Sequence, residues 1–79
     1  MTKQLRLLLM KDEVFRVPSE FGRLKVRSGH AWLTMAGQDL TLVRGQEVDL
    51  ESKAGKPVVS TAGRLPVVVE LIAASRPQD

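Results

Sequence analysis

The chain has 79 residues, 27% charged residues and a net charge of +3 at neutral pH, which fits one folded domain rather than a disordered polyelectrolyte. It contains no cysteine, which excludes disulfide bonds, cysteine-ligated metal sites and thiol nucleophiles. A domain this small has a thin core, so self-association is a natural way for it to gain stability.

The first segment, residues 2–10, leaves two interpretations open. Leu5, Leu7 and Leu9 alternate with other residues, as in a strand. The same leucine-rich run is also a good helix former. Neither this run nor residues 65–74 are long enough to cross a bilayer, and no signal-peptide core is visible. We therefore expect a cytoplasmic protein without membrane contact.

The rest of the chain consists of short alternating runs separated by turn residues, which predicts an all-β domain. Strands are expected at residues 5–9, 14–17, 23–27, 30–35, 39–43, 46–50, 57–61 and 65–72. Short strands with closely spaced turns are typical of a small barrel or sandwich, here of about seven or eight antiparallel strands. The prediction is one β domain over residues 1–79, with an ordered core at about 5–72 and a frayed tail at 73–79.

Positively charged residues follow one face of the expected strand 23–27. Leu24 and Val26 point to the core, and Arg23, Lys25 and Arg27 point to solvent. Such a stripe is usually a solvated sheet face, but it also supports contact with nucleic acid phosphates. The aromatic residues do not interleave with the stripe, as a single-strand binder would require.

The turns are predicted from glycine and from one aspartate. Gly29, Gly37 and Gly45 occupy turn positions where a positive φ is often needed, with Ser28-Gly29 expected to form a hairpin turn. Asp39, just after the turn at residues 36–38, is expected to accept hydrogen bonds from backbone N–H groups and so to fix that hairpin.

His30 and Trp32 share a strand face and are the chain's only histidine and tryptophan. His30 has no acidic partner nearby in sequence, so it is interpreted as a strand-edge residue rather than a catalytic base or metal ligand. Trp32 is interpreted as core or dimer interface, with a ligand-stacking platform as the alternative. No catalytic, metal-binding or cofactor-binding set is predicted.

The stretch LKVRSGHAWLTMAGQDLTLVRGQEVDL, residues 24–50, resembles a family of small bacterial proteins of unknown function with a cupin-like half-barrel. The landmarks in order are Ser28, Gly29, Trp32, Leu33, Thr34, Gly37, Asp39, Leu42, Gly45 and Gln46. The resemblance extends over residues 9–72 and implies a cupin-like fold without an established activity. Cupins that bind metal use several histidines and a glutamate, so the single His30 does not carry that chemistry over.

Three hypotheses about function follow. The first is a non-catalytic binding or interaction module that forms a homodimer. The sequence does not identify the further protein or small molecule that it would bind. The second is a nucleic-acid-binding regulator that uses Arg23, Lys25 and Arg27. Residues 14–21, VFRVPSEF, also resemble in part the strand-to-helix step of swapped-hairpin DNA-binding regulators. The third is a small-molecule-binding barrel with Trp32 in its pocket.

Overall fold

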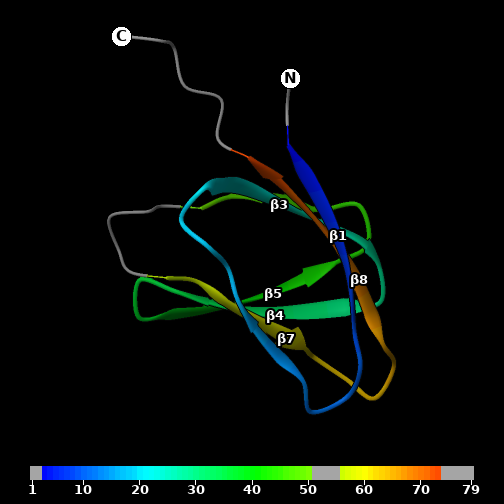
Figure 1. Ribbon diagram of the computed structural model, residues 1–79. Helices are drawn as coiled ribbons and strands as arrows, with labels where there is room; N and C mark the ends of the chain where they lie inside the picture. Colours follow the sequence, from blue (N-terminus) through cyan, green and yellow to red (C-terminus); the bar gives the residue numbers. More distant parts are fainter. Residues whose placement is uncertain (1–2, 51–55, 74–79) are drawn as a thin grey trace, which may run out of the picture.

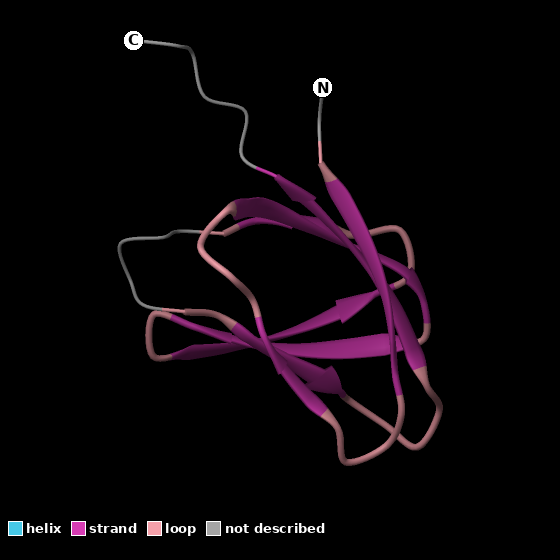
Figure 2. Cartoon of the chain, in the orientation of Figure 1, coloured by secondary structure: helices cyan, strands magenta, loops and turns pink. Residues whose placement is uncertain are grey.

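The computed structural model describes residues 3–50 and 56–73, which form eight antiparallel strands and no helix (Figures 1 and 2). The strands are β1 (Gln4–Leu9), β2 (Val14–Arg16), β3 (Phe21–Ser28), β4 (His30–Met35), β5 (Gln38–Val43), β6 (Glu47–Asp49), β7 (Val58–Thr61) and β8 (Val67–Ala73). The predicted all-β fold is confirmed. None of the described residues belongs to a helix that could span a membrane.

The strands form two four-stranded sheets that face each other (Figure 1). Sheet A has the order β1-β8-β3-β6, and sheet B has the order β2-β7-β4-β5. Only β4 and β5 are both consecutive in sequence and paired, and every other connection carries the chain from one sheet to the other. This connectivity is that of a jelly roll, an eight-stranded sandwich in which all connections except the β4–β5 hairpin cross to the opposite sheet.

The connection at Gly29 differs from the expected hairpin turn. β3 belongs to sheet A and β4 to sheet B, so Gly29 is a corner between the sheets and the two strands do not pair. The local sequence shows that a strand ends at Gly29. Only the pairing partners of the two strands decide whether the turn there is a hairpin or a crossover between sheets.

The core lies between the two sheets and is apolar. Alternation along each strand sends one set of side chains inward, as the pattern of residues 23–27 predicted for Leu24 and Val26. The largest fully buried side chains are Leu24, Leu33, Leu71, Val17, Val26, Val59, Val67 and Val69. Among the described residues, none of the buried side chains is polar or charged.

The structure tests three expectations: a possible helix in the first segment, a possible helix after VFRVPSEF, and a frayed tail. The ambiguous first segment forms strand β1, because its leucines pair with the valines and Leu71 of β8. β3 begins at Phe21, after the turn that follows Pro18, so no helix follows the VFRVPSEF segment. Ala73, expected in the frayed tail, ends β8, and its N–H donates to the carbonyl of Lys3 at 2.8 Å. The rest of the expected tail, 74–79, lies outside the described residues.

Two tight turns fix the register of sheet B and its link to sheet A. Ala36 and Gly37 both have positive φ, of 56° and 75°, as a two-residue type I′ hairpin requires. In the β5–β6 turn, Gly45 has φ 89° and the side-chain carbonyl of Gln46 accepts the N–H of Val43 at 2.8 Å. The predicted positive φ of Gly29, Gly37 and Gly45 is confirmed.

Candidate functional site

Trp32 lies on the outer face of sheet B and is 46% exposed. Its expected place in the core is therefore wrong for the single chain. The residues opposite it, Thr41 on β5 and Ser60 on β7, are polar, whereas Ala31 and Leu33 of the same strand face Leu42, Leu40 and Val59 and are fully buried. The roles predicted for Trp32 in a dimer interface or in stacking against a ligand remain predictions.

A shallow depression of about 320 Å³ lies beside Trp32. It is lined by the β1–β2 loop, the end of β7 and the residues that follow it, through Lys11, Asp12, Glu13, Val14, Ser60, Thr61, Ala62 and Gly63. Glu13 is engaged there, because its Oε1 accepts the N–H of Met10 at 2.7 Å. The depression lies outside the sandwich, so Trp32 does not occupy a pocket in the barrel interior.

His30 is exposed at the start of β4, opposite Val43. Asp39 lies at the other end of the β4–β5 hairpin, as expected, opposite Thr34. Its Oδ1 accepts a hydrogen bond from the Thr34 hydroxyl at 3.0 Å. Asp39 therefore links the two strands of the hairpin as predicted, but its donor is the Thr34 side chain and not the backbone N–H groups that were expected. Within residues 3–50 and 56–73, no group of three or more histidine or acidic side chains is placed to hold a metal ion.

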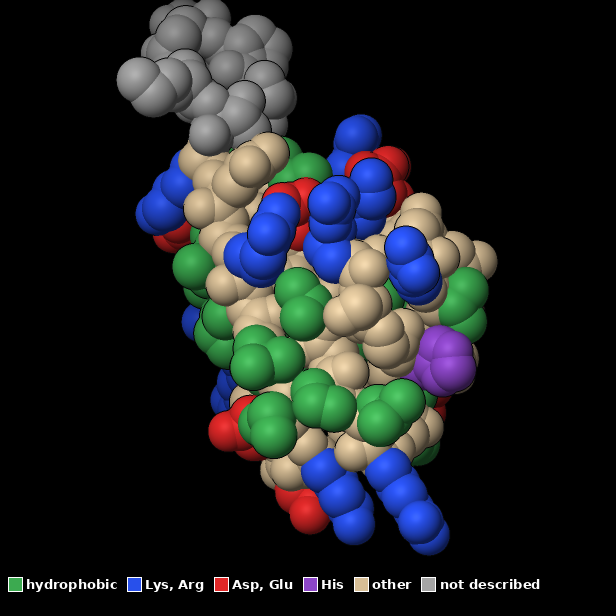
Figure 3. Space-filling view, turned by 90° about the vertical axis from the view of Figure 1, so that its right-hand side faces the viewer, with side chains coloured by type: hydrophobic (Ala, Val, Ile, Leu, Met, Phe, Trp, Pro, Cys, Tyr) green, Lys and Arg blue, Asp and Glu red, His purple; other side chains and the backbone are tan. Residues whose placement is uncertain are grey.

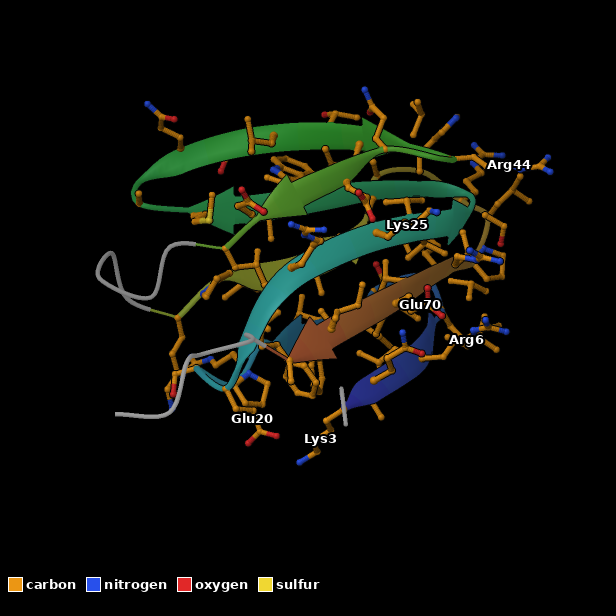
Figure 4. The ribbon with its side chains drawn as sticks, turned by 90° about the horizontal axis from the view of Figure 1, so that it is seen from above. Lys3, Arg6, Glu20, Lys25, Arg44 and Glu70 are labelled. Atoms are coloured by element: carbon orange, nitrogen blue, oxygen red, sulfur yellow. The ribbon has the colours of Figure 1, made fainter. Side chains whose placement is uncertain are left out.

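The predicted positive stripe of β3 exists, but carboxylates are interleaved with it. Lys25 stands between Glu70 of β8 and Glu47 of β6, and Arg6 of β1 lies on the far side of Glu70 (Figure 4). Arg23 Nε lies 3.4 Å from an Asp49 oxygen. Because opposite residues of antiparallel strands share a face, these rows alternate in sign and the stripe is largely neutralised.

Glu70 is the centre of this charged row. Its side chain is only 15% exposed, and its oxygens lie 3.1 Å from Arg6 Nη2 and 3.9 Å from Arg27 Nη1. The Glu70 carboxylate therefore accepts a hydrogen bond from Arg6 and forms a longer ion pair with Arg27, so it contacts guanidinium groups on both neighbouring strands. The sequence could not show this pairing, because residues 6, 27 and 70 meet only when β8 inserts between β1 and β3.

A second positive cluster lies at the end of the sandwich where the β3–β4, β5–β6 and β7–β8 connections meet. A depression of about 380 Å³ there is lined by Gly29, His30, Arg44, Gly63, Arg64 and Leu65. We call this set the arginine rim. Arg44 also lines an adjacent, smaller hollow with Lys25, Val26, Arg27 and Gly45. Sequence reasoning missed the rim: its arginines lie in separate turns, Arg44-Gly45 and Gly63-Arg64, and only the topology brings these turns to one end.

No protein-family model matches the chain, and no curated protein matches it. Solved structures do. The Cupin_2 domain of an XRE family transcriptional regulator from Enterobacter cloacae is 21% identical, with a TM-score of 0.76 over 95% of this chain and 83% of that one.

Two further structures are similar. A cupin protein from Bacteroides fragilis is 18% identical, with a TM-score of 0.75 over 99% of this chain and 70% of that chain. An HTH_3 family transcriptional regulator from Vibrio cholerae is 13% identical, with a TM-score of 0.73, and the match covers 95% of this chain but only 44% of the regulator. These similarities establish the cupin fold that the sequence resemblance implied.

Proposed function

We propose that this cupin-fold domain is a non-catalytic binding or interaction module that self-associates. The observation that carries the proposal is an exposed apolar surface on the β1 side of the sandwich. Leu8 of β1 is 59% exposed, Met10 after it is 50% exposed, and Leu65 before β8 is 73% exposed. Leu8 lies directly opposite Val68 of β8, so these side chains adjoin on one face.

Hydrophobic side chains gather on this face below a band of charged ones (Figure 3). β1 is also the edge strand of sheet A and pairs with β8 alone among the described strands. An edge strand leaves a row of backbone N–H and C=O groups that another chain can pair with. Apolar side chains beside an open edge support an interface with a second copy, which would also enlarge a thin core.

Analytical ultracentrifugation over a range of micromolar concentrations tests this proposal, with Leu8→Lys as the variant. Leu8→Lys should be monomeric where the wild type is dimeric, because it places a charge in the apolar surface. Val14→Lys is the matched control, since Val14 is similarly exposed but lies on β2 of sheet B. A wild type that stays monomeric throughout would remove the self-association.

A second proposal is contact with nucleic acid through Arg23, Lys25 and Arg27. The occurrence of this fold in two transcriptional regulators favours it, and the carboxylates of Asp49, Glu47 and Glu70 beside the stripe weigh against it. Titration of duplex and single-stranded DNA at low salt tests it, because the phosphate attraction is strongest there. Absence of binding under those conditions would end this proposal.

A further inference from the structure

The arginine rim is built from three loops that are held in place by contacts of their own. The β3–β4 corner lies against the β7–β8 loop, where the Ala62 N–H donates to the His30 carbonyl at 2.9 Å. The β5–β6 turn is bound to β3, with the Gly45 N–H donating to the Val26 carbonyl at 2.8 Å. The chain segments that carry His30, Arg44 and Arg64 are therefore fixed before any ligand arrives, which lowers the entropy cost of binding.

Among the described residues, the arginines of the rim lack the ion pairs that offset the charges of sheet A. Arg6, Arg23 and Arg27 each form an ion pair with a carboxylate. Within the described part of the chain, neither Arg44 nor Arg64 forms one. None of the described residues that line the depression shared by these two arginines and His30 carries a carboxylate. Asp12 and Glu13 line the neighbouring depression beside Trp32, which shares Gly63 with this one.

This combination selects an anion. Guanidinium groups present forked N–H donors that match the oxygens of phosphate, and an imidazole adds another donor. The volume of about 380 Å³ falls within the range of small-molecule sites, roughly 300–1,000 Å³. Leu65, 73% exposed, provides an apolar wall against which an organic group can pack.

We infer that the arginine rim binds the phosphate group of a small molecule, with Arg44 and Arg64 as the principal ligands and His30 as an additional donor. The inference rests on the proposed role as a binding module and names the chemistry of its ligand. Arg44 lies across the molecule from Lys3 and Glu20 (Figure 4), so the site is at the opposite end from that ion pair and from the start of β3.

Amide NMR titration with phenyl phosphate and with inorganic phosphate, at constant ionic strength, tests the inference. Phenyl phosphate should shift the amides of residues 29–30, 44–45 and 63–65. Arg44→Gln and Arg64→Gln should each weaken binding about tenfold, the loss expected for one charge-assisted hydrogen bond. The spectrum of each variant shows directly whether it is folded. Tighter binding of phenyl phosphate than of inorganic phosphate identifies a phosphate ester as the ligand, and equal binding identifies free phosphate at the same site.

Arg23→Gln is the matched control, since it removes the same charge from the far end of β3. An equal loss of affinity in Arg23→Gln would overturn the inference, because the effect would then be one of net charge. If a short DNA duplex shifts these amides and phenyl phosphate does not, the inference that the ligand is a small molecule is overturned. Ultracentrifugation of the same samples separates the two proposals: phosphate binding by a monomer supports the rim and contradicts only self-association.

Discussion

The carbonyl oxygen of Pro66 lies 2.4 Å from the position that a Cβ atom on Gly29 would occupy. Gly29 also has φ 79°, which residues with a side chain rarely adopt. Gly29→Ala should therefore lower the free energy of unfolding by more than the roughly 1–2 kcal/mol that the backbone conformation costs alone. Urea denaturation measures the loss.

Gly37→Ala is the control for that experiment. Gly37 has a similar φ of 75°, but a Cβ atom there would meet nothing within 4 Å. Gly37→Ala should therefore lower the free energy of unfolding by only about 1–2 kcal/mol. Equal losses in the two variants would show that the corner at Gly29 moves to accept a methyl group.

Ala36→Asn should stabilise the protein. Ala36 has φ 56° at the first central position of the β4–β5 turn, where an asparagine followed by Gly37 is the favoured type I′ sequence. The expected gain is about 1 kcal/mol, seen as a higher melting temperature. Ala62→Asn, at an exposed residue without positive φ, should leave the melting temperature nearly unchanged.

Trp32→Ala should leave the protein folded. Trp32 lies opposite Thr41 and Ser60 on the outer face of sheet B rather than in the core, so the expected cost is about 1–2 kcal/mol, from cross-strand pairs. Leu33→Ala, its buried neighbour, should cost about 2–5 kcal/mol. Chemical denaturation compares the two, and iodide should quench the emission of the wild-type tryptophan. A Trp32→Ala chain that fails to fold would return Trp32 to a structural role.

Glu70→Gln should destabilise sheet A in a salt-dependent way. The change removes the negative charge that Arg6 and Arg27 share, at an expected cost of about 1 kcal/mol at low ionic strength. The difference from wild type should shrink at high salt, where such pairs are screened. Glu20→Gln, which breaks the exposed pair with Lys3, should have a smaller effect. A Glu70→Gln penalty that is independent of salt would contradict the electrostatic explanation.

The sequence predicts the strands well because each carries its own alternation. Leu24 and Val26 show the inward face of β3 without reference to any other strand. β4 is different, since both of its faces carry large apolar side chains and alternation alone does not say which is buried. The hairpin register decides the question: a two-residue turn at 36–37 places Leu33 opposite Leu40 and Trp32 opposite Thr41. That register was within reach of the sequence.

The contacts between strands and turns that are distant in sequence were not within reach. The pairing of Glu70 with Arg6 and Arg27 and the arginine rim both depend on strand order, and each joins residues that are far apart in the chain. Turn residues mark where the chain changes direction, but they do not say which turns meet at the same end. The corner at Gly29 was mistaken for a hairpin for the same reason.

The position of β8 in the middle of sheet A has a consequence for biosynthesis. β1 and β3 each pair with β8, and neither pairs with the other, so a chain growing from its N-terminus cannot assemble sheet A until β8 has been synthesised. Until then the leucines of β1 have no partner strand and are open to chaperones or to other nascent chains. The order of synthesis and the dominance of distant pairings both favour late, slow folding in one step. A stalled or truncated chain that lacks β8 would therefore be a substrate for proteolysis rather than a partly working domain.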